Sequence, residues 1–333
     1  MSSFYDIIGQ QTAVNFLQGA IREKRVSHAY IFDGQPMSGK RTLARIFAET
    51  LLCEEGGDNP CGHCHSCAMA KSGNHPDIIT VSHEKPATLS VGEIRQQLVG
   101  DIGIKPYTGR KKVYIVPDAS LMNPQAQNAL LKTLEEPPHY AVIILLTDNE
   151  MKLLPTLRSR SVTLKMRPVS EKLIEDYLKN KGEISERQAK IAAAFSGGSL
   201  GRAKALIEDE AFEGLKNEIL RVVEGITKFS FTDINDSIKK ASEYKDRIND
   251  YLDMLLLFMR DVLYTKAAGD DAKIVFSGEE LLIGTKAKTM SYEKINTVME
   301  EINTVRSRLT SNVNFDMTME LLFLTMKGNR ENG

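Results

Sequence analysis

The sequence predicts an α/β fold built on a parallel sheet, followed by a second part made only of helices. Residues 29–32, AYIF, form a short apolar strand that leads straight into a glycine-rich loop and a helix. Residues 113–116 and 141–146 are apolar, mostly β-branched runs, which is typical of parallel strands covered on both faces. From about Pro168 the alternation of strands and helices stops, and helical periodicity continues to the end.

Composition indicates a multidomain globular protein. Its 333 residues exceed what one hydrophobic core usually supports, and 42% of them are hydrophobic and 26% charged. The 43 basic and 44 acidic residues give a net charge of −1, so no global positive field favours nucleic acid or a membrane. The sequence has no apolar run of the roughly 20 residues that span a bilayer and no charged segment followed by an apolar one at its start. A cytoplasmic protein is expected.

The first elements are a helix and a phosphate-binding loop. Apolar residues recur at helical spacing between positions 4 and 25, and the basic residues Arg22, Lys24 and Arg25 close that helix. The loop after the first strand matches GxxxxGK, and its candidate phosphate-binding residues are Gly34, Gly39, Lys40, Arg41 and Thr42. Glycines let backbone N–H groups surround a phosphate, and the following helix adds its dipole. Glycine-rich turns between a strand and a helix also occur without ligands, and that alternative stays open.

Both residues that would hold magnesium in such a loop are altered. The position after Lys40 normally carries a Ser or Thr hydroxyl, but here it is Arg41, whose guanidinium has no lone pair for a metal. Thr42 lies about 100° further around the helix and is poorly placed to substitute. The strand 113–116 ends in Pro117 where a metal carboxylate is expected, although the acidic Asp118 follows. Nucleotide binding therefore remains possible, but hydrolysis is not expected.

All four cysteines fall within fifteen residues, which predicts a zinc site. Cys53 is followed by Cys61, Cys64 and Cys67 in CxxCxxC spacing. Four thiolates complete the tetrahedral set of a closed structural zinc site, whereas disulfides are disfavoured in a reducing cytosol. The intervening glycines, proline and polar residues form turns with little core of their own, so the metal would give this insert its shape. The two histidines between the ligands are expected to be solvated.

The central stretch 112–138 predicts a strand, a turn and a capped helix. Asn123 and Pro124 supply an N-cap and a first helical residue, and Pro137 and Pro138 end the helix. Further elements follow from the same kind of signal. They are a capping-box helix over 91–101, a strand over 141–146 with a polar tip at 147–149, helices over 184–195 and 201–207, and long apolar stripes over 248–263, stopped by Gly269, and 295–309. The polar tip indicates either a ligand site or a plain turn.

A basic rim precedes the central strand and consists of Lys105, Arg110, Lys111 and Lys112. Solvated surface is favoured there over a DNA site.

These motifs together resemble the AAA+ subunits of the bacterial DNA polymerase III clamp loader. The resemblance rests on IIGQ at 7–10, HAYIF at 28–32, the phosphate loop, the cysteine insert, NALLKTLEEPP at 128–138 and the arginines of 158–160. Because both magnesium positions are lost, the chain is similar to the delta-prime type rather than to the gamma/tau motor. The resemblance covers essentially the whole chain and is most specific before Arg167.

The resemblance implies three domains: an AAA+ module over 1–167 with its zinc insert over 53–67, a helical lid over 168–208, and a helical collar over 209–333. It implies a stator subunit without ATPase activity of its own, in a DNA-directed DNA polymerase holoenzyme. Its partners would be gamma/tau and delta subunits in a hetero-pentamer, which loads a sliding clamp onto primed DNA. Arg160 would supply an arginine finger in trans to a neighbouring ATP site, while the position of Arg202 leaves a nucleotide-sensing role open.

Two other functions are compatible with the residues. The chain could be a gamma/tau-like motor that hydrolyses ATP with Thr42 and Asp118 in an unusual geometry. Alternatively, the zinc insert and the basic rim could form a nucleic-acid-binding module, which would retain DNA with a steep dependence on salt.

Overall fold

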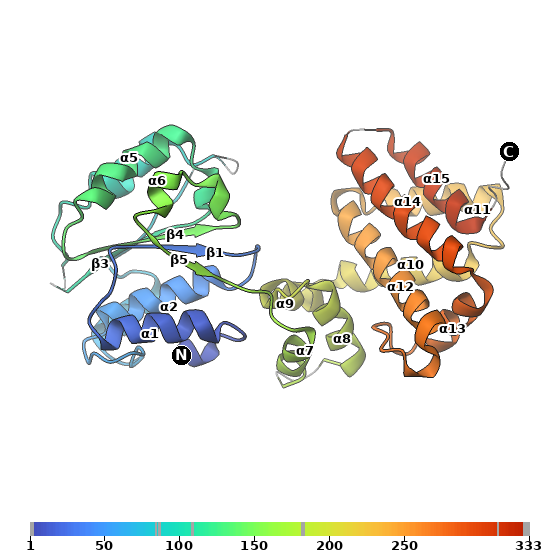
Figure 1. The fold of residues 1–333 in the computed structure, drawn as a ribbon, viewed down its shortest axis with the longest axis horizontal. Helices are drawn as coiled ribbons and strands as arrows, with labels where there is room; N and C mark the ends of the chain where they lie inside the picture. Colours follow the sequence, from blue (N-terminus) through green and yellow to red (C-terminus); the bar gives the residue numbers. More distant parts are fainter. Residues whose placement is uncertain are drawn as a thin grey trace. The chain divides into compact units, whose positions relative to one another are not determined.

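The computed structural model describes residues 3–83, 85, 88–107, 110–180, 184–311 and 313–328. The chain forms two compact units (Figure 1). The first comprises Met1–Leu173 and Gly198–Arg202, and the second comprises Ile174–Gly197 and Ala203–Gly333. The further division of the helical part into a lid and a collar stays a prediction.

A five-stranded parallel sheet lies at the centre of the first unit. Its strand order is β2-β3-β4-β1-β5, and every neighbouring pair is parallel. Its strands are β1 (Ala29–Asp33), β2 (Ile78–Thr80), β3 (Lys112–Val116), β4 (Ala141–Thr147) and β5 (Val162–Lys165). Because the strands are parallel, the segments that follow β1, β3 and β4 meet at one edge of the sheet.

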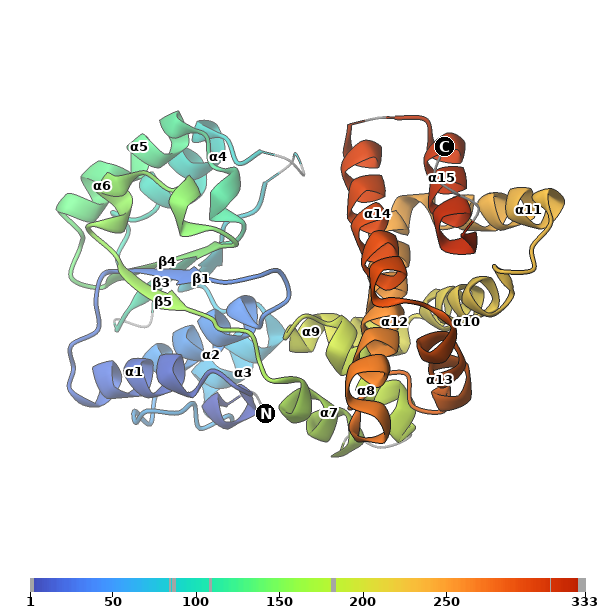
Figure 2. The same ribbon diagram turned by 45° about the vertical axis from the view of Figure 1, so that its right-hand side comes forward.

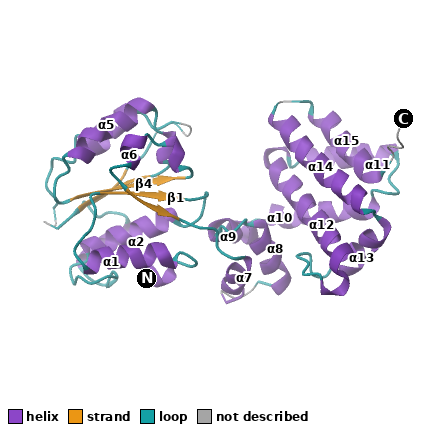
Figure 3. Ribbon diagram, viewed as in Figure 1, coloured by secondary structure: helices purple, strands orange, loops and turns teal. Residues whose placement is uncertain are grey.

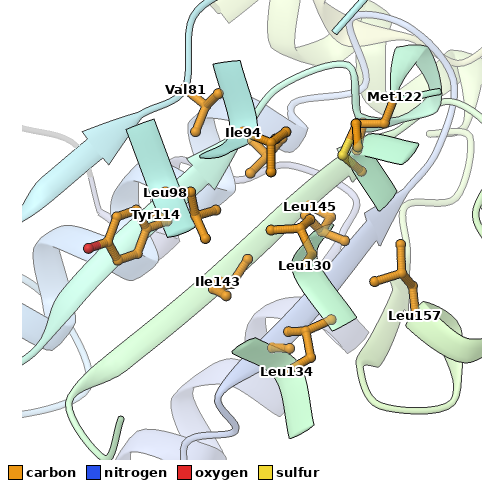
Figure 4. Close-up of a cluster of buried hydrophobic side chains, with 14 of the residues drawn as sticks. Val81, Ile94, Leu98, Tyr114, Met122, Leu130, Leu134, Ile143, Leu145 and Leu157 are labelled. Atoms are coloured by element: carbon orange, nitrogen blue, oxygen red, sulfur yellow. The ribbon is translucent and has the colours of Figure 1, made fainter. Parts of the chain in front are cut away.

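Helices cover both faces of the sheet. They are α1 (Gln11–Arg22), α2 (Lys40–Leu52), α3 (His65–Ser72), α4 (Val91–Ile94), α5 (Pro124–Glu135) and α6 (Pro155–Arg158). Figure 1 shows α1 and α2 on one face and α5 and α6 on the other, and Figure 2 shows α4 beside α5. Side chains of β1, β3 and β4 alternate between two buried clusters, one under each helical layer. In the cluster of Figure 4, Leu130 and Leu134 of α5 pack on Ile143 and Leu145 of β4.

The predicted central elements are confirmed. The strands predicted over 29–32, 113–116 and 141–146 are β1, β3 and β4. Asn123 caps α5, since its side chain accepts a hydrogen bond from the N–H of Ala126, and α5 ends before the two prolines. β2 and β5 were not predicted; they lie at the two edges of the sheet and have only three and four residues.

Two helix boundaries differ from expectation. The periodicity between positions 4 and 25 does not form one helix, because a 3-10 turn at Phe4–Asp6 is followed by Gly9 at φ +72° before α1 begins. That glycine conformation disrupts a right-handed helix. The helix expected over 91–101 begins with its predicted Ser90–Glu93 capping box, but after Ile94 it widens into a π-helical turn, Arg95–Val99.

The rest of the chain is helical, as predicted (Figure 3). Its helices are α7 (Glu171–Asn180), α8 (Glu186–Phe195), α9 (Leu200–Glu208), α10 (Glu210–Gly225), α11 (Phe231–Ser242), α12 (Ile248–Ala268), α13 (Glu280–Thr289), α14 (Tyr292–Thr310) and α15 (Phe315–Lys327). The two long apolar stripes lie on α12 and α14, and α12 ends at Gly269, at φ +61°. Among the described residues, no helix is long and apolar enough to cross a bilayer.

Candidate phosphate loop, metal centre and arginine finger

The glycine-rich loop has the strand-loop-helix context that the motif requires. It connects the end of β1 to Lys40, the first residue of α2, and Gly39 caps α2 at φ +94°. Gly34 is required for close packing, because a Cβ there would lie 2.7 Å from the Cβ of Met166. The geometry therefore places the first N–H groups of α2 at the edge where β1, β3 and β4 end.

The Lys40 ammonium is turned back onto its own loop. It donates hydrogen bonds to the carbonyl oxygens of Gly34 and Gln35, the latter at 2.8 Å. Burial lowers the pKa of Lys40, while the nearby carboxylates of Asp148, Asp33 and Asp118 oppose that shift. The lysine that would neutralise a phosphate is thus held by backbone carbonyls and faces acidic residues.

Arg41, at the first altered magnesium position, contacts Asp118, the acidic residue that follows Pro117 at the second. Nη2 of Arg41 lies 2.7 Å from Oδ2 of Asp118. Asp118 adopts a left-handed conformation at φ +49° immediately after Pro117, and its side chain contacts Arg41 on α2. Arg41 and Pro117 also line a cavity of about 500 Å³. Arg41 therefore brings a positive charge to the carboxylate that would otherwise be available to a metal, and Thr42 is exposed on the first turn of α2.

The start of α9 and the residue before it pack onto the phosphate loop within the same unit. Oγ of Ser199 donates to the carbonyl oxygen of Pro36 at 3.2 Å. The N–H of Gly201 donates to the carbonyl oxygen of Met37, also at 3.2 Å. A Cβ on Gly201 would lie 2.6 Å from this Met37 oxygen, so only glycine allows the approach. Arg202 directly follows this contact.

The polar residues at the end of β4 form a turn and hydrogen-bond with one another. Oγ1 of Thr147 donates to the carbonyl oxygen of Asn149 at 3.0 Å and accepts from its N–H at 3.1 Å. The side chain of Asn149 then accepts from the N–H of Met151. A hydrogen bond from Ser120 is the main cause of the lowered pKa of Asp148, so this carboxylate is charged at neutral pH and lies near Lys40.

The four cysteines converge on one centre. Their sulfur atoms all lie within 4.8 Å of one another, and none of them forms a disulfide. Cys53 and Cys67 are buried, Cys53 directly follows α2, and Cys64 caps α3. A tetrahedral metal with bonds of about 2.3 Å requires sulfurs roughly 3.8 Å apart, so the cluster can hold a metal ion. His63 and His65 are both exposed, and Nε2 of His63 lies 2.5 Å from a carboxylate oxygen of Glu55.

Arginines tie the cysteine insert to the sheet unit. Nη2 of Arg45, on α2, donates to the carbonyl oxygens of Ala70 and Lys71 at the end of α3. Arg110 donates to the carbonyl oxygens of Cys53 and Glu54. Both contacts place positive charge at the C-terminal end of a helix, where it is favourable. Arg45 had no sequence signal, because its partners are distant backbone atoms.

The basic rim predicted before the central strand is used mostly inside the unit. Besides Arg110, Lys111 donates to the carbonyl oxygen of His139, and Lys112 is buried with its ammonium 2.7 Å from Oδ2 of Asp101. The expectation that these residues form a merely solvated surface is therefore wrong for Lys112. Lys105 is exposed.

Arg160 is presented at the surface and has two contacts. Its Nη2 lies 3.0 Å from Oε1 of Glu135, and its Nη1 donates to the carbonyl oxygen of Thr156 at 3.2 Å. Its side chain is 37% exposed, so it can exchange Glu135 for another anion. Glu135 is the last residue of α5 and belongs to the LEEPP motif, but the sequence alone did not join the two residues.

Comparisons with known proteins give a family. The model of the family described as DNA polymerase III, delta subunit, matches residues 9–170. The DNA polymerase III subunit delta' of Bacillus subtilis is 31% identical over 96% of this chain and 96% of its own length. The tau/gamma subunit of Haemophilus influenzae is 34% identical over 53% of this chain, but over only 25% of its own.

Among solved structures, a gamma-subunit-related protein of Thermotoga maritima aligns over 96% of this chain and 98% of its own, at 18% identity and a TM-score of 0.45. The whole-length match to a delta' subunit, together with the parallel sheet and its altered phosphate loop, leads to one assignment. The chain belongs to the family of delta' subunits of bacterial DNA polymerase III.

Proposed function

We propose that the chain is a clamp-loader subunit of the delta' type, which helps to place a sliding clamp on primed DNA without hydrolysing ATP itself. The match to a delta' subunit over 96% of both chains supports the assignment, whereas the tau subunit of Bacillus subtilis matches over 80% of this chain but only 51% of its own length. The observation that carries the absence of ATP hydrolysis is the ion pair formed by Arg41 and Asp118. Phosphoryl transfer needs a metal held by a hydroxyl and a carboxylate. Here Arg41 replaces the hydroxyl, Pro117 stands where the carboxylate is expected, and the acidic Asp118 that follows is paired with Arg41.

Steady-state ATP hydrolysis by the purified chain tests this proposal. With magnesium and primed DNA present, we expect no turnover above that of Lys40→Ala. Saturable turnover that Lys40→Ala abolishes would instead identify a gamma/tau-like motor that uses Thr42 and Asp118.

Arg160 is proposed to act as an arginine finger in a neighbouring subunit's ATP site. Its partial exposure and its contact with an exposed carboxylate support this role, because Glu135 can hold the guanidinium ready and release it to a phosphate. The partners would be gamma/tau and delta subunits in a cytoplasmic hetero-pentamer that belongs to a DNA-directed DNA polymerase holoenzyme.

The finger is tested in the reconstituted complex. Arg160→Ala should assemble normally and lower the ATP turnover of the partner motor by roughly 10³-fold or more, as loss of such a finger does elsewhere. Arg25→Ala is the matched control, because Arg25 is 82% exposed and pairs only with nearby Glu23 among the described residues. Unchanged turnover with Arg160→Ala would eliminate the finger role.

The metal at the four cysteines is proposed to be zinc, held for structure alone. A complete thiolate set leaves no open position for a substrate, so the site supplies no catalysis. Two arginines connect this insert to the sheet unit, which supports a scaffolding role over a free nucleic-acid module. Absence of DNA retention by the isolated chain at low salt would agree with this assignment, and retention with a steep salt dependence would favour the module.

A further inference from the structure

The second unit contains a cavity of about 340 Å³ that the proposed function does not use. The ends of four helices and the side of a fifth line it. Its apolar walls come from Val223, Ile226, Met259, Met290, Val298 and Met326. Its polar lining includes three lysines, Lys286, Lys294 and Lys327. The volume is at the lower end of the range for small-molecule sites.

Lys286 is an exception among the buried lysines. The described part of the chain buries three lysines, namely Lys112, Lys216 and Lys286. The first two have carboxylate partners in Asp101 and Glu213. Lys286, only 7% exposed, has none within ion-pair distance among the described residues, and its ammonium donates to the carbonyl oxygen of Glu224 at a long 3.4 Å. Buried ammonium groups are normally paired, so this one lacks the expected anion.

Lys294 strengthens the same argument from a different helix. Its ammonium donates to the carbonyl oxygen of Thr325, and burial lowers its pKa with no described carboxylate to oppose the shift. Burial also lowers the pKa of Lys286, where the Glu224 carboxylate opposes the shift and Lys228 adds to it. Helix-end carbonyls explain one donor of each lysine, but each ammonium has three.

We propose that this cavity binds a small organic anion, with a carboxylate or phosphate group held by Lys286 and Lys294 and an apolar body packed among the methionines. The anion supplies the missing charge partner, and the apolar walls exclude water from it, which strengthens the ion pair. Met259, Met290 and Met326 can adapt to the shape of such a body.

Ligand-observed NMR titrations of the zinc-loaded full chain test this site. The probes are hexanoate, hexyl phosphate, neutral hexanol and inorganic phosphate. We expect saturable binding of at least one of the two amphiphilic anions, and the stronger of them identifies the head group. Hexanol and inorganic phosphate should each bind at least tenfold more weakly.

Matched variants distinguish a ligand site from lysines that only cap the C-terminal ends of helices. Lys286→Met and Lys294→Met should each weaken binding roughly tenfold or more, the size of one charge-assisted hydrogen bond. Lys288 is an exposed lysine on the same helix as Lys286, and Lys288→Met should leave anion binding unchanged. If Lys286→Met does not fold, two other variants test the site. Lys286→Arg keeps the charge and should keep anion binding, whereas Lys294→Met should weaken it. No binding by the folded chain, or equal binding by Lys294→Met and Lys288→Met, overturns the proposal.

Discussion

At the scale of single residues, the change to Arg41 after the phosphate loop produces a contact with Asp118. Arg41 and Asp118 are 77 positions apart, yet their side chains meet because β3 ends beside the start of α2. Lys40 is retained from the motif, but its ammonium binds the loop's own carbonyls. Both cations at the loop are thus engaged within the chain, Lys40 by carbonyl oxygens and Arg41 by the Asp118 carboxylate.

This contact should matter little for stability. The side chains of Arg41 and Asp118 are 70% and 49% exposed, and surface ion pairs contribute about 0–1 kcal/mol. Asp118→Ala should therefore change the free energy of unfolding in urea by less than about 1 kcal/mol. Asp101→Ala is the contrasting variant, since it leaves buried Lys112 without its partner and should cost several times more. Equal losses for the two variants would contradict this reading.

The pH dependence of stability should report the burial of Lys286. Burial keeps the pKa of Lys286 in the folded chain below its ordinary value of 10.5. At pH values between the folded pKa and 10.5, the unfolded chain therefore binds more protons than the folded chain. Stability from this group therefore rises as pH increases toward 10.5 and is lost as pH falls through the folded pKa. Urea unfolding from pH 7 to 10 should show a smaller increase for Lys286→Met than for Lys288→Met. Parallel profiles would show that Lys286 is solvated.

At the scale of elements, α2 joins the two features that the sequence singled out. It begins in the phosphate loop and is followed directly by Cys53, and Arg45 on its side holds the end of α3. The loop between Cys53 and Cys64 contains three glycines with positive φ, at 56, 57 and 62, so it has little regular structure of its own. The metal is therefore expected to order the insert.

Removal of the metal ion proposed at the four cysteines should loosen the insert and leave the sheet intact. The described residues 54–73 contribute few side chains to the buried core, whereas β1, β3 and β4 are buried along their whole apolar length. A chelator should raise amide hydrogen exchange over 54–73 at least tenfold and leave exchange in β4 unchanged. Cys61→Ser should give the same pattern without chelator. Exchange that rises equally in β4 would show that the metal supports the whole unit.

At the scale of the whole molecule, the chain has two units with separate cores. Leu145 of β4 belongs to the first unit and Ile302 of α14 to the second, and both are 0% exposed. A Leu or Ile truncated to Ala in a core costs about 2–5 kcal/mol. Leu145→Ala should therefore increase hydrogen exchange in the sheet and not in α14, and Ile302→Ala should do the opposite. Either variant increasing exchange in both units would mean that they unfold together.

Much of the fold follows from local signals. The strand, loop and helix around Lys40 and the capped helix at Asn123 were predictable, because capping, proline position and apolar periodicity act within a few residues. The edge strands β2 and β5 were not, since three or four residues carry too little pattern and pairing with a neighbour defines them. The start of α1 was missed because periodicity extended through Gly9, whose backbone conformation only the folded chain reveals.

The α/β class, the loop with its altered metal positions, the four clustered cysteines and the helical second part were all predictable from the sequence, because each depends on residue type at short spacing. Only the tertiary structure decided that Arg41 pairs with Asp118, that Glu135 holds Arg160 and that Lys286 is buried without a carboxylate. Such contacts join residues from distant parts of the chain, and their energies depend on burial and distance, which exist only after the chain has folded.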